Sequence, residues 1–196
     1  ITLSFSKIKA FSDSPVIFMR YMIARELKED KATPAMVFGD LVDCLILTPD
    51  EIASRFIIEP EGGALNSIKG ADILLDFYSA TPEGDKLADK KAAIQAAREA
   101  SGKRIIEPDS LKKAKAIRDR VYYNYASGWV MSNITATQVN TEFAAFDWDW
   151  RGKIDGEGAG LIMDLKKVVS ALPKRAEATI KDMRYHWQGA LYTLPR

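Results

Sequence analysis

Charged side chains lie just before and within an apolar run of the chain in residues 151–168. The stretch reads R-G-K-I-D-G-E-G-A-G-L-I-M-D-L-K-K-V and contains Asp155, Asp164 and Lys166. A charge in a strand that packs on both faces is costly unless it is paired or bound to an ion. Strand alternation points Asp164 and Lys166 to one face, and a glycine-rich turn over residues 156–160 lets Asp155 lie across from them.

Two carboxylates beside an amine suit the chemistry of a divalent cation on a phosphate ester. Mg²⁺ takes carboxylate, carbonyl and water oxygens and in proteins usually also binds substrate phosphates. The cation polarises the phosphoryl oxygen, and the lysine orients or deprotonates the attacking water. An ordinary cross-strand ion pair explains Asp164-x-Lys166 better when the tripeptide stands alone. Asp155, the glycine turn and the apolar setting together favour an Mg²⁺ site, in which Mn²⁺ is expected to substitute.

Three segments, taken in order, carry a family resemblance. The stretch with the two aspartates and the lysine reads G-K-I-D and then L-I-M-D-L-K-K. It is preceded by S-F-S-K-I-K-A-F-S-D-S-P and T-P-A-M-V-F-G-D-L-V-D-C-L-I-L-T-P, and it is followed by Y-H-W-Q-G-A-L-Y. Together they resemble the PD-(D/E)XK nuclease superfamily and, within it, the RecE-like (exodeoxyribonuclease VIII type) phage or prophage exonucleases. The resemblance runs from about Phe5 to Tyr192.

The resemblance implies a role for each matching residue. Asp155 corresponds to the first acid and Asp164-x-Lys166 to the second element, with the Leu165 carbonyl as a further metal ligand. The last segment corresponds to a Q-x-x-x-Y helix, whose Gln188 and Tyr192 are expected to contact the DNA backbone or order the metal shell.

One position departs from the RecE-like pattern. Relatives usually carry a histidine metal ligand where this chain has Asp43, on an expected core helix that also places Gly39 on the same face. Because aspartate is a hard ligand that suits Mg²⁺, we expect Asp43 to replace the histidine as a ligand. The alternative is that Asp43 pairs with a buried basic group or water.

Other chemically interesting residues have two interpretations each. Residues 138–146 alternate as a strand does, so the Glu142 side chain could point toward the metal. A glutamate at the edge of a strand, with no role in the site, explains the pattern equally well. Trp148 and Trp150 could stack on bases, but packing across a hairpin is favoured. His186 is the only histidine and is left out of the expected site, because a lone histidine is more often structural.

Composition limits the class of protein. The 196 residues, 47% hydrophobic and 28% charged, suit one soluble globular domain, and no apolar run suggests a membrane span. Cys44 is the only cysteine, so no intrachain disulfide is possible, and its apolar surroundings favour a buried thiol in a reducing cytoplasm. With 28 basic and 27 acidic side chains, any DNA-binding surface must be local.

The expected fold is α/β, a central mixed sheet flanked by helices, with a restriction-endonuclease-like PD-(D/E)XK core and a helical insert. We expect a single nuclease domain over residues 1–196, with an N-terminal helical region to about residue 50, insert helices at about 80–126, and the catalytic hairpin and following helix at about 138–194. Helices are expected over 6–27 (one or two), 35–47, 81–100, 108–126 and 175–194, and a strand over 55–59. The segment from 68 to 78 stays unassigned.

By resemblance, the expected function is Mg²⁺-dependent hydrolysis of linear double-stranded DNA from its ends, 5′ to 3′, in phage-type recombination. The implied partners are DNA ends, a single-strand annealing protein and further copies of the chain in a ring, in the cytoplasm of a bacterial host. One alternative is a RecB-like or Cas4-like repair nuclease, although the four cysteines of an iron–sulfur cluster are lacking. Another is a catalytically silent DNA-binding or assembly module of the same fold.

Overall fold

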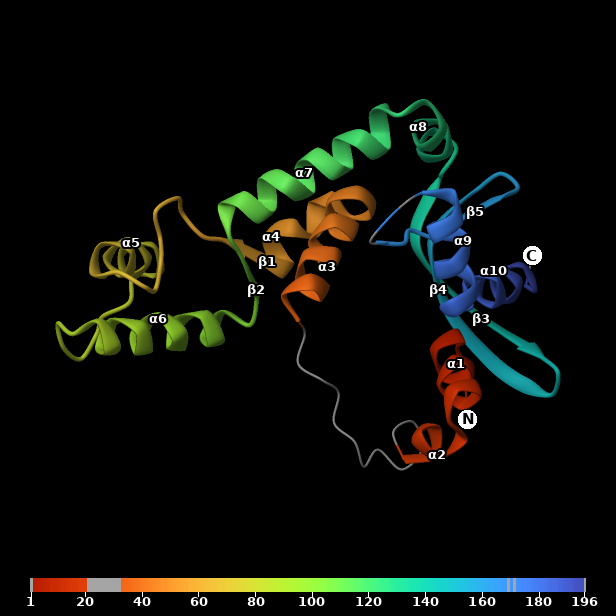
Figure 1. Cartoon of the computed structure of the whole chain (residues 1–196), viewed down its shortest axis with the longest axis horizontal. Coiled ribbons are helices and arrows are strands. Elements are labelled where there is room, and N and C mark those ends of the chain that lie inside the picture. Colours follow the sequence, from red (N-terminus) through yellow and green to blue (C-terminus); the bar gives the residue numbers. More distant parts are fainter. Residues whose placement is uncertain (1, 21–32, 169, 171, 196) are drawn as a thin grey trace. The chain divides into compact units, whose positions relative to one another are not determined.

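The computed structural model describes residues 2–20, 33–168, 170 and 172–195 (Figure 1). The chain divides into two compact units, residues 1–32 with 125–196, and residues 33–124. The expectation of one nuclease domain stays a prediction. None of the described helices is both long enough and apolar enough to cross a membrane.

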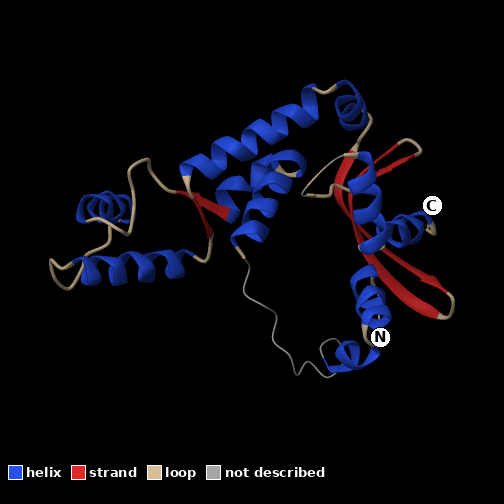
Figure 2. Cartoon of the chain, viewed as in Figure 1, coloured by secondary structure: helices blue, strands red, loops and turns tan. Residues whose placement is uncertain are grey.

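The first unit is built on an antiparallel sheet of three strands in the order β3-β4-β5 (Figure 2). The strands are β3 (Ala136–Ala145), β4 (Trp148–Gly158) and β5 (Leu161–Met163). Phe146 and Asp147 both have positive φ angles, 54° and 63°, as a two-residue hairpin turn with the twist of its strands requires. The predicted strand at 138–146 is therefore confirmed.

Trp150 confirms the interpretation of hairpin packing. Its ring stacks on Phe143, with centroids 6.1 Å apart, and its indole N–H donates to the Ala145 carbonyl at 2.8 Å. It is 7% exposed, whereas Trp148 is 49% exposed. Trp150 therefore belongs to the core of this unit together with Ile154 and Tyr192.

In the part of this unit that the structure describes, the sheet is accompanied by the helices α1 (Phe5–Asp13), α2 (Pro15–Phe18), α8 (Tyr125–Ser132), α9 (Pro173–Asp182) and α10 (Tyr185–Thr193). The prediction of a single last helix is wrong. Arg184 takes a left-handed conformation (φ 55°) between α9 and α10, and its guanidinium pairs with Asp13 at the end of α1. This tertiary ion pair supports a backbone break that local propensity does not favour. The part of the predicted first helix beyond residue 20 lies outside the described residues.

The second unit is mainly helical. It contains α3 (Pro34–Leu47), a 3₁₀ turn η2 (Pro49–Glu51), α4 (Ile52–Arg55), β1 (Phe56–Ile58), α5 (Ile68–Tyr78), α6 (Leu87–Ser101), β2 (Arg104–Ile106) and α7 (Pro108–Tyr123). Thr33 caps α3 by accepting a hydrogen bond from the Met36 N–H, and Gly102 (φ 62°) ends α6, in keeping with the preference of these residue types for helix ends. Cys44 is buried in α3, which confirms the expected buried thiol.

The strands differ from the expected single mixed sheet. Those of the described residues form two separate sheets, the antiparallel β3-β4-β5 and a parallel pair, β1 with β2. Helices with small sheets of both pairing types are compatible with the expected α/β class. Residues 68–78, unassigned from sequence, form the helix α5, capped by Ser67.

A buried ionic network holds the second unit together next to β1. The Glu59 side chain, 6% exposed, accepts hydrogen bonds from Arg98 Nε and Nη2 and from the Tyr78 hydroxyl, each at 2.8 Å. The Glu59 N–H also donates to the Ile106 carbonyl at 3.0 Å. The Glu59 carboxylate therefore links α5 to α6, and the Glu59 backbone connects them to the two-stranded sheet.

Ionisation of Tyr78 should lower the stability of the folded protein at alkaline pH. Burial and the hydrogen bond to the Glu59 carboxylate raise the pKa of the Tyr78 phenol from 10.0 to about 12. Because the folded-state pKa is the higher one, the contribution of the neutral phenol is complete below about pH 10 and is lost as the pH rises through about 12. We expect Tyr78→Phe to lower stability by about 1 kcal/mol at neutral pH and to flatten the fall of the melting temperature between these pH values. An unchanged slope in the variant would contradict this assignment.

Candidate active site

Asp155 is fixed in place by two hydrogen bonds. It lies near the end of β4, where Oδ2 accepts from the Leu165 backbone N–H at 2.8 Å and Oδ1 from Gln138 Nε2 at 3.3 Å. The bond to Leu165 replaces a ladder bond, so β5 ends at Met163. The prediction that Asp164 and Lys166 belong to the strand is therefore wrong, since they lie immediately after it.

Asp164 and Lys166 form an ion pair next to Asp155. The distance from Lys166 Nζ to Asp164 Oδ2 is 2.7 Å, and the ammonium also lies 4.9 Å from the centre of the Tyr185 ring. Burial raises the pKa of the Asp164 carboxyl, Lys166 acts in the opposite direction, and the negative charge of Asp155 adds to the rise. The protein therefore holds two nearby carboxylates at some electrostatic cost, which a bound cation would relieve.

The α10 helix contacts this site through Gln188 and Tyr192. Gln188 Nε2 donates to Asp164 Oδ1 at 3.0 Å and to the Tyr192 hydroxyl at 2.7 Å, and that hydroxyl donates to the Lys153 carbonyl at 2.9 Å. Gln188 and Tyr192 are 8% and 7% exposed. This chain of bonds fixes the Asp164 carboxylate relative to β4. It brings Asp155, Asp164, Gln188 and Tyr192 together, as the sequence pattern predicts.

A glycine makes room for Tyr192. A Cβ added at Gly152 would lie 2.9 Å from Tyr192 Cε1 and 3.3 Å from Thr141 Cγ2. Contacts this short between a fixed Cβ and a buried ring require the ring to move. Gly152 of the G-K-I-D sequence is therefore needed for the position of the aromatic ring that supports Gln188.

Gln138 is a site residue that the sequence analysis missed. It has a positive φ of 55° within β3, although it is neither glycine nor in a turn, and the pair it would form with Asp155 is absent from the β3–β4 register. Its side-chain amide instead binds the Asp155 carboxylate. A strained residue at this point fits a functional site, but a glutamine at the start of a strand gives no sequence signal of it.

Glu142 lies away from the carboxylates. It is exposed and pairs in register with Arg151, four residues and about 13 Å along β4 from Asp155. The structure does not bring it to the site. Asp43 is half-buried on α3, in the other compact unit, so its role as a ligand stays a prediction.

The donor set fits a hard divalent cation that keeps several waters. Within the described ranges, no group of three or more histidine, cysteine, aspartate or glutamate side chains is arranged to hold a metal. Asp155 and Asp164 provide two adjacent carboxylates, and one or two are usual where Mg²⁺ also binds substrate phosphates. The buried Gln188 Oε1 has no hydrogen-bond partner, as expected of an acceptor beside a site for water or a hydrated ion.

The chain matches the sequence model of a known family over nearly its whole length. The sequence model of the family described as a PDDEXK-like domain of unknown function (DUF3799) matches residues 4–194. No curated protein matches the chain. No solved structure matches it either.

Proposed function

The chain belongs to this PDDEXK-like family, and from that premise we propose that it hydrolyses phosphodiester bonds of DNA with the help of Mg²⁺. The observation that carries the proposal is the Asp164–Lys166 ion pair, set beside Asp155 and held by Gln188. Two carboxylates and an ammonium within one small site are the groups that this reaction requires.

Each residue has a defined task in the proposed reaction. Asp155, Asp164 and the Leu165 carbonyl would hold Mg²⁺, which when bound polarises the phosphoryl oxygen and acidifies water. Lys166 aligns the attacking water and offsets negative charge that develops on the phosphate during in-line attack. Gln188 and Tyr192 keep Asp164 oriented, and the Leu165 N–H and Gln138 do the same for Asp155.

The finer proposal is a RecE-like exonuclease that degrades one strand of linear duplex DNA from its 5′ end. On this proposal the partners are DNA ends, a single-strand annealing protein and other copies of the chain in a ring. Incubation with linear and with covalently closed circular duplex DNA, each with Mg²⁺ or with EDTA, tests it. Degradation of the linear form alone, and only with Mg²⁺, supports the exonuclease. Cleavage of both forms indicates an endonuclease, and cleavage of neither favours a silent DNA-binding module.

Asp43 is proposed as an additional ligand, in place of the histidine of RecE-like relatives. We expect Asp43→Ala to abolish hydrolysis and Asp43→His to retain part of it, with a shift in preference from Mg²⁺ toward Mn²⁺, because imidazole is the softer ligand. Asp40→Ala is a matched control on the same helix, since Asp40 forms an ion pair with Arg104. Full Mg²⁺-dependent activity in Asp43→Ala would make Asp43 structural.

A further inference from the structure

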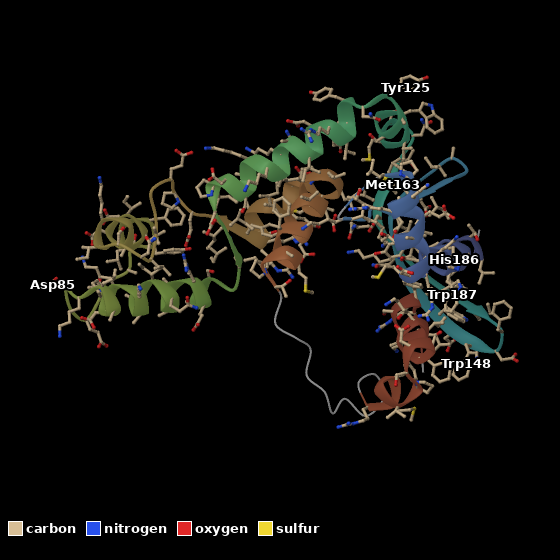
Figure 3. All side chains as sticks on the ribbon, in the orientation of Figure 1. Asp85, Tyr125, Trp148, Met163, His186 and Trp187 are labelled. Carbon is tan, nitrogen blue, oxygen red and sulfur yellow. The ribbon has the colours of Figure 1, made fainter. Side chains whose placement is uncertain are left out.

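A groove of about 480 Å³ adjoins the Asp164–Lys166 ion pair. One turn of α9 forms one side of it, through Ala176, Thr179 and Ile180, and Tyr185 and His186 at the start of α10 also line it. Figure 3 labels His186 on this part of the chain. The groove therefore continues directly from the residues that would act on a phosphate.

The lining of the groove is largely apolar, with a few polar groups. Ile180 is 45% exposed, although it is a large hydrophobic side chain. The Thr179 hydroxyl donates to the Arg175 carbonyl within its own helix, and His186 is exposed. Apolar walls with a small number of polar groups are the usual lining of a small-molecule pocket of this volume.

The chain segment that supplies most of the groove lining has an excess of positive charge, which favours an anionic occupant. Asp164 is the one acidic residue among those described residues that line it, and Lys166 already pairs with that carboxylate. The segment from residue 166 to 184 contains six basic and two acidic residues. If a phosphate binds beside Lys166, the group that is bonded to this phosphate would lie along α9.

We propose that this groove is the subsite for one nucleoside of the DNA strand, the nucleoside attached to the phosphate at the active site. The inference rests on the proposed phosphodiester hydrolysis and adds the surface that positions the strand. The base and sugar lie against Ala176 and Ile180, while His186 at the rim contacts polar edges of the nucleotide. Because apolar walls form no base-specific hydrogen bonds, the subsite accepts all four nucleosides.

Two alanines on α9 provide a matched test. Ala176 lines the groove, whereas Ala178 is exposed and points about 200° further round the helix. Ala176→Phe fills the groove, and Ala178→Phe adds the same side chain outside it. Binding of deoxyadenosine 5′-monophosphate is measured with Mg²⁺ by calorimetry, and the methyl NMR signals of Thr179 and Ile180 locate the ligand.

We expect the Ala176→Phe variant to bind the mononucleotide about tenfold more weakly or worse, and Ala178→Phe to stay within about twofold of the parent protein. Inorganic phosphate, which needs only the inner end of the site, should bind both variants equally. Equal mononucleotide binding by both variants, no mononucleotide binding to the parent protein, or shifts confined to residues outside the groove would overturn the proposal.

The outcome is separable from that of the proposed function, because mononucleotide binding is measured without hydrolysis. Binding of the mononucleotide in the groove without any cleavage of DNA would support the subsite and reject the proposed reaction. Cleavage of DNA with the same KM by both phenylalanine variants would support the reaction and reject the subsite. Capture of a peptide in place of the nucleotide would also reject the subsite.

Discussion

Replacing Asp164 or Lys166 by alanine is expected to reduce DNA hydrolysis by a factor on the order of 10³ or more. Both side chains belong to the ion pair at the site, and neither fills the core. Since burial already disfavours the charged form of Asp164, its loss should leave the fold stable. Hydrolysis of end-labelled linear duplex DNA measures the effect, with Lys69→Ala on the exposed surface of α5 as the control.

The two variants should differ in metal binding. Asp164→Ala removes a ligand and should reduce the rise in melting temperature that Mg²⁺ causes. Lys166→Ala removes a nearby positive charge and should preserve or increase that rise. Wild-type hydrolysis in either variant would reject the site, and an equal loss of the Mg²⁺ effect in both would mean that Lys166 supports the metal instead of the water.

Glu59→Ala should have the largest effect on the stability of the fold. Removing one partner of a buried ion pair leaves the other without compensation and typically costs about 3–5 kcal/mol. Here Arg98 and Tyr78 would both lose their acceptor. Because whole domains are stable by only about 5–15 kcal/mol, the unit over residues 33–124 should be near its unfolding threshold, as urea titration followed by circular dichroism can measure.

Glu61→Ala is the matched control for this prediction. Glu61 lies two residues further along the chain and pairs with Lys112 at 2.9 Å, but both side chains are mostly exposed. Exposed pairs contribute about 0–1 kcal/mol, so its removal should change the unfolding midpoint little. Similar losses in Glu59→Ala and Glu61→Ala would show that the buried network does not hold α5 and α6 to the sheet.

The sequence predicted the features that depend on local signals. Thr33 and Pro34 mark the start of α3, Gly102 marks the end of α6, and alternating residues mark β3. The proximity of Asp155, Asp164 and Lys166 was also predicted, from their spacing around a glycine-rich turn.

The features that the sequence did not predict depend on individual side-chain and backbone contacts. The break at Arg184 accompanies an ion pair with Asp13, and β5 stops at Met163 because the Asp155 carboxylate takes the Leu165 N–H. The α5 helix packs closely on the preceding loop at Gly70, where an added Cβ would lie 2.6 Å from the Ala64 carbonyl oxygen. Residue type and spacing do not show which of these contacts will form.

The close fit between Gly152 and the ring of Tyr192 has an evolutionary consequence. An added Cβ at position 152 would lie 2.9 Å from the tyrosine ring, so the two positions cannot enlarge independently. Relatives that carry a side chain at the position of Gly152 should carry a residue smaller than tyrosine at position 192, and covariation between the two columns should be detectable once many relatives are aligned. In laboratory selection, a change at either position should be tolerated mainly after a compensating change at the other.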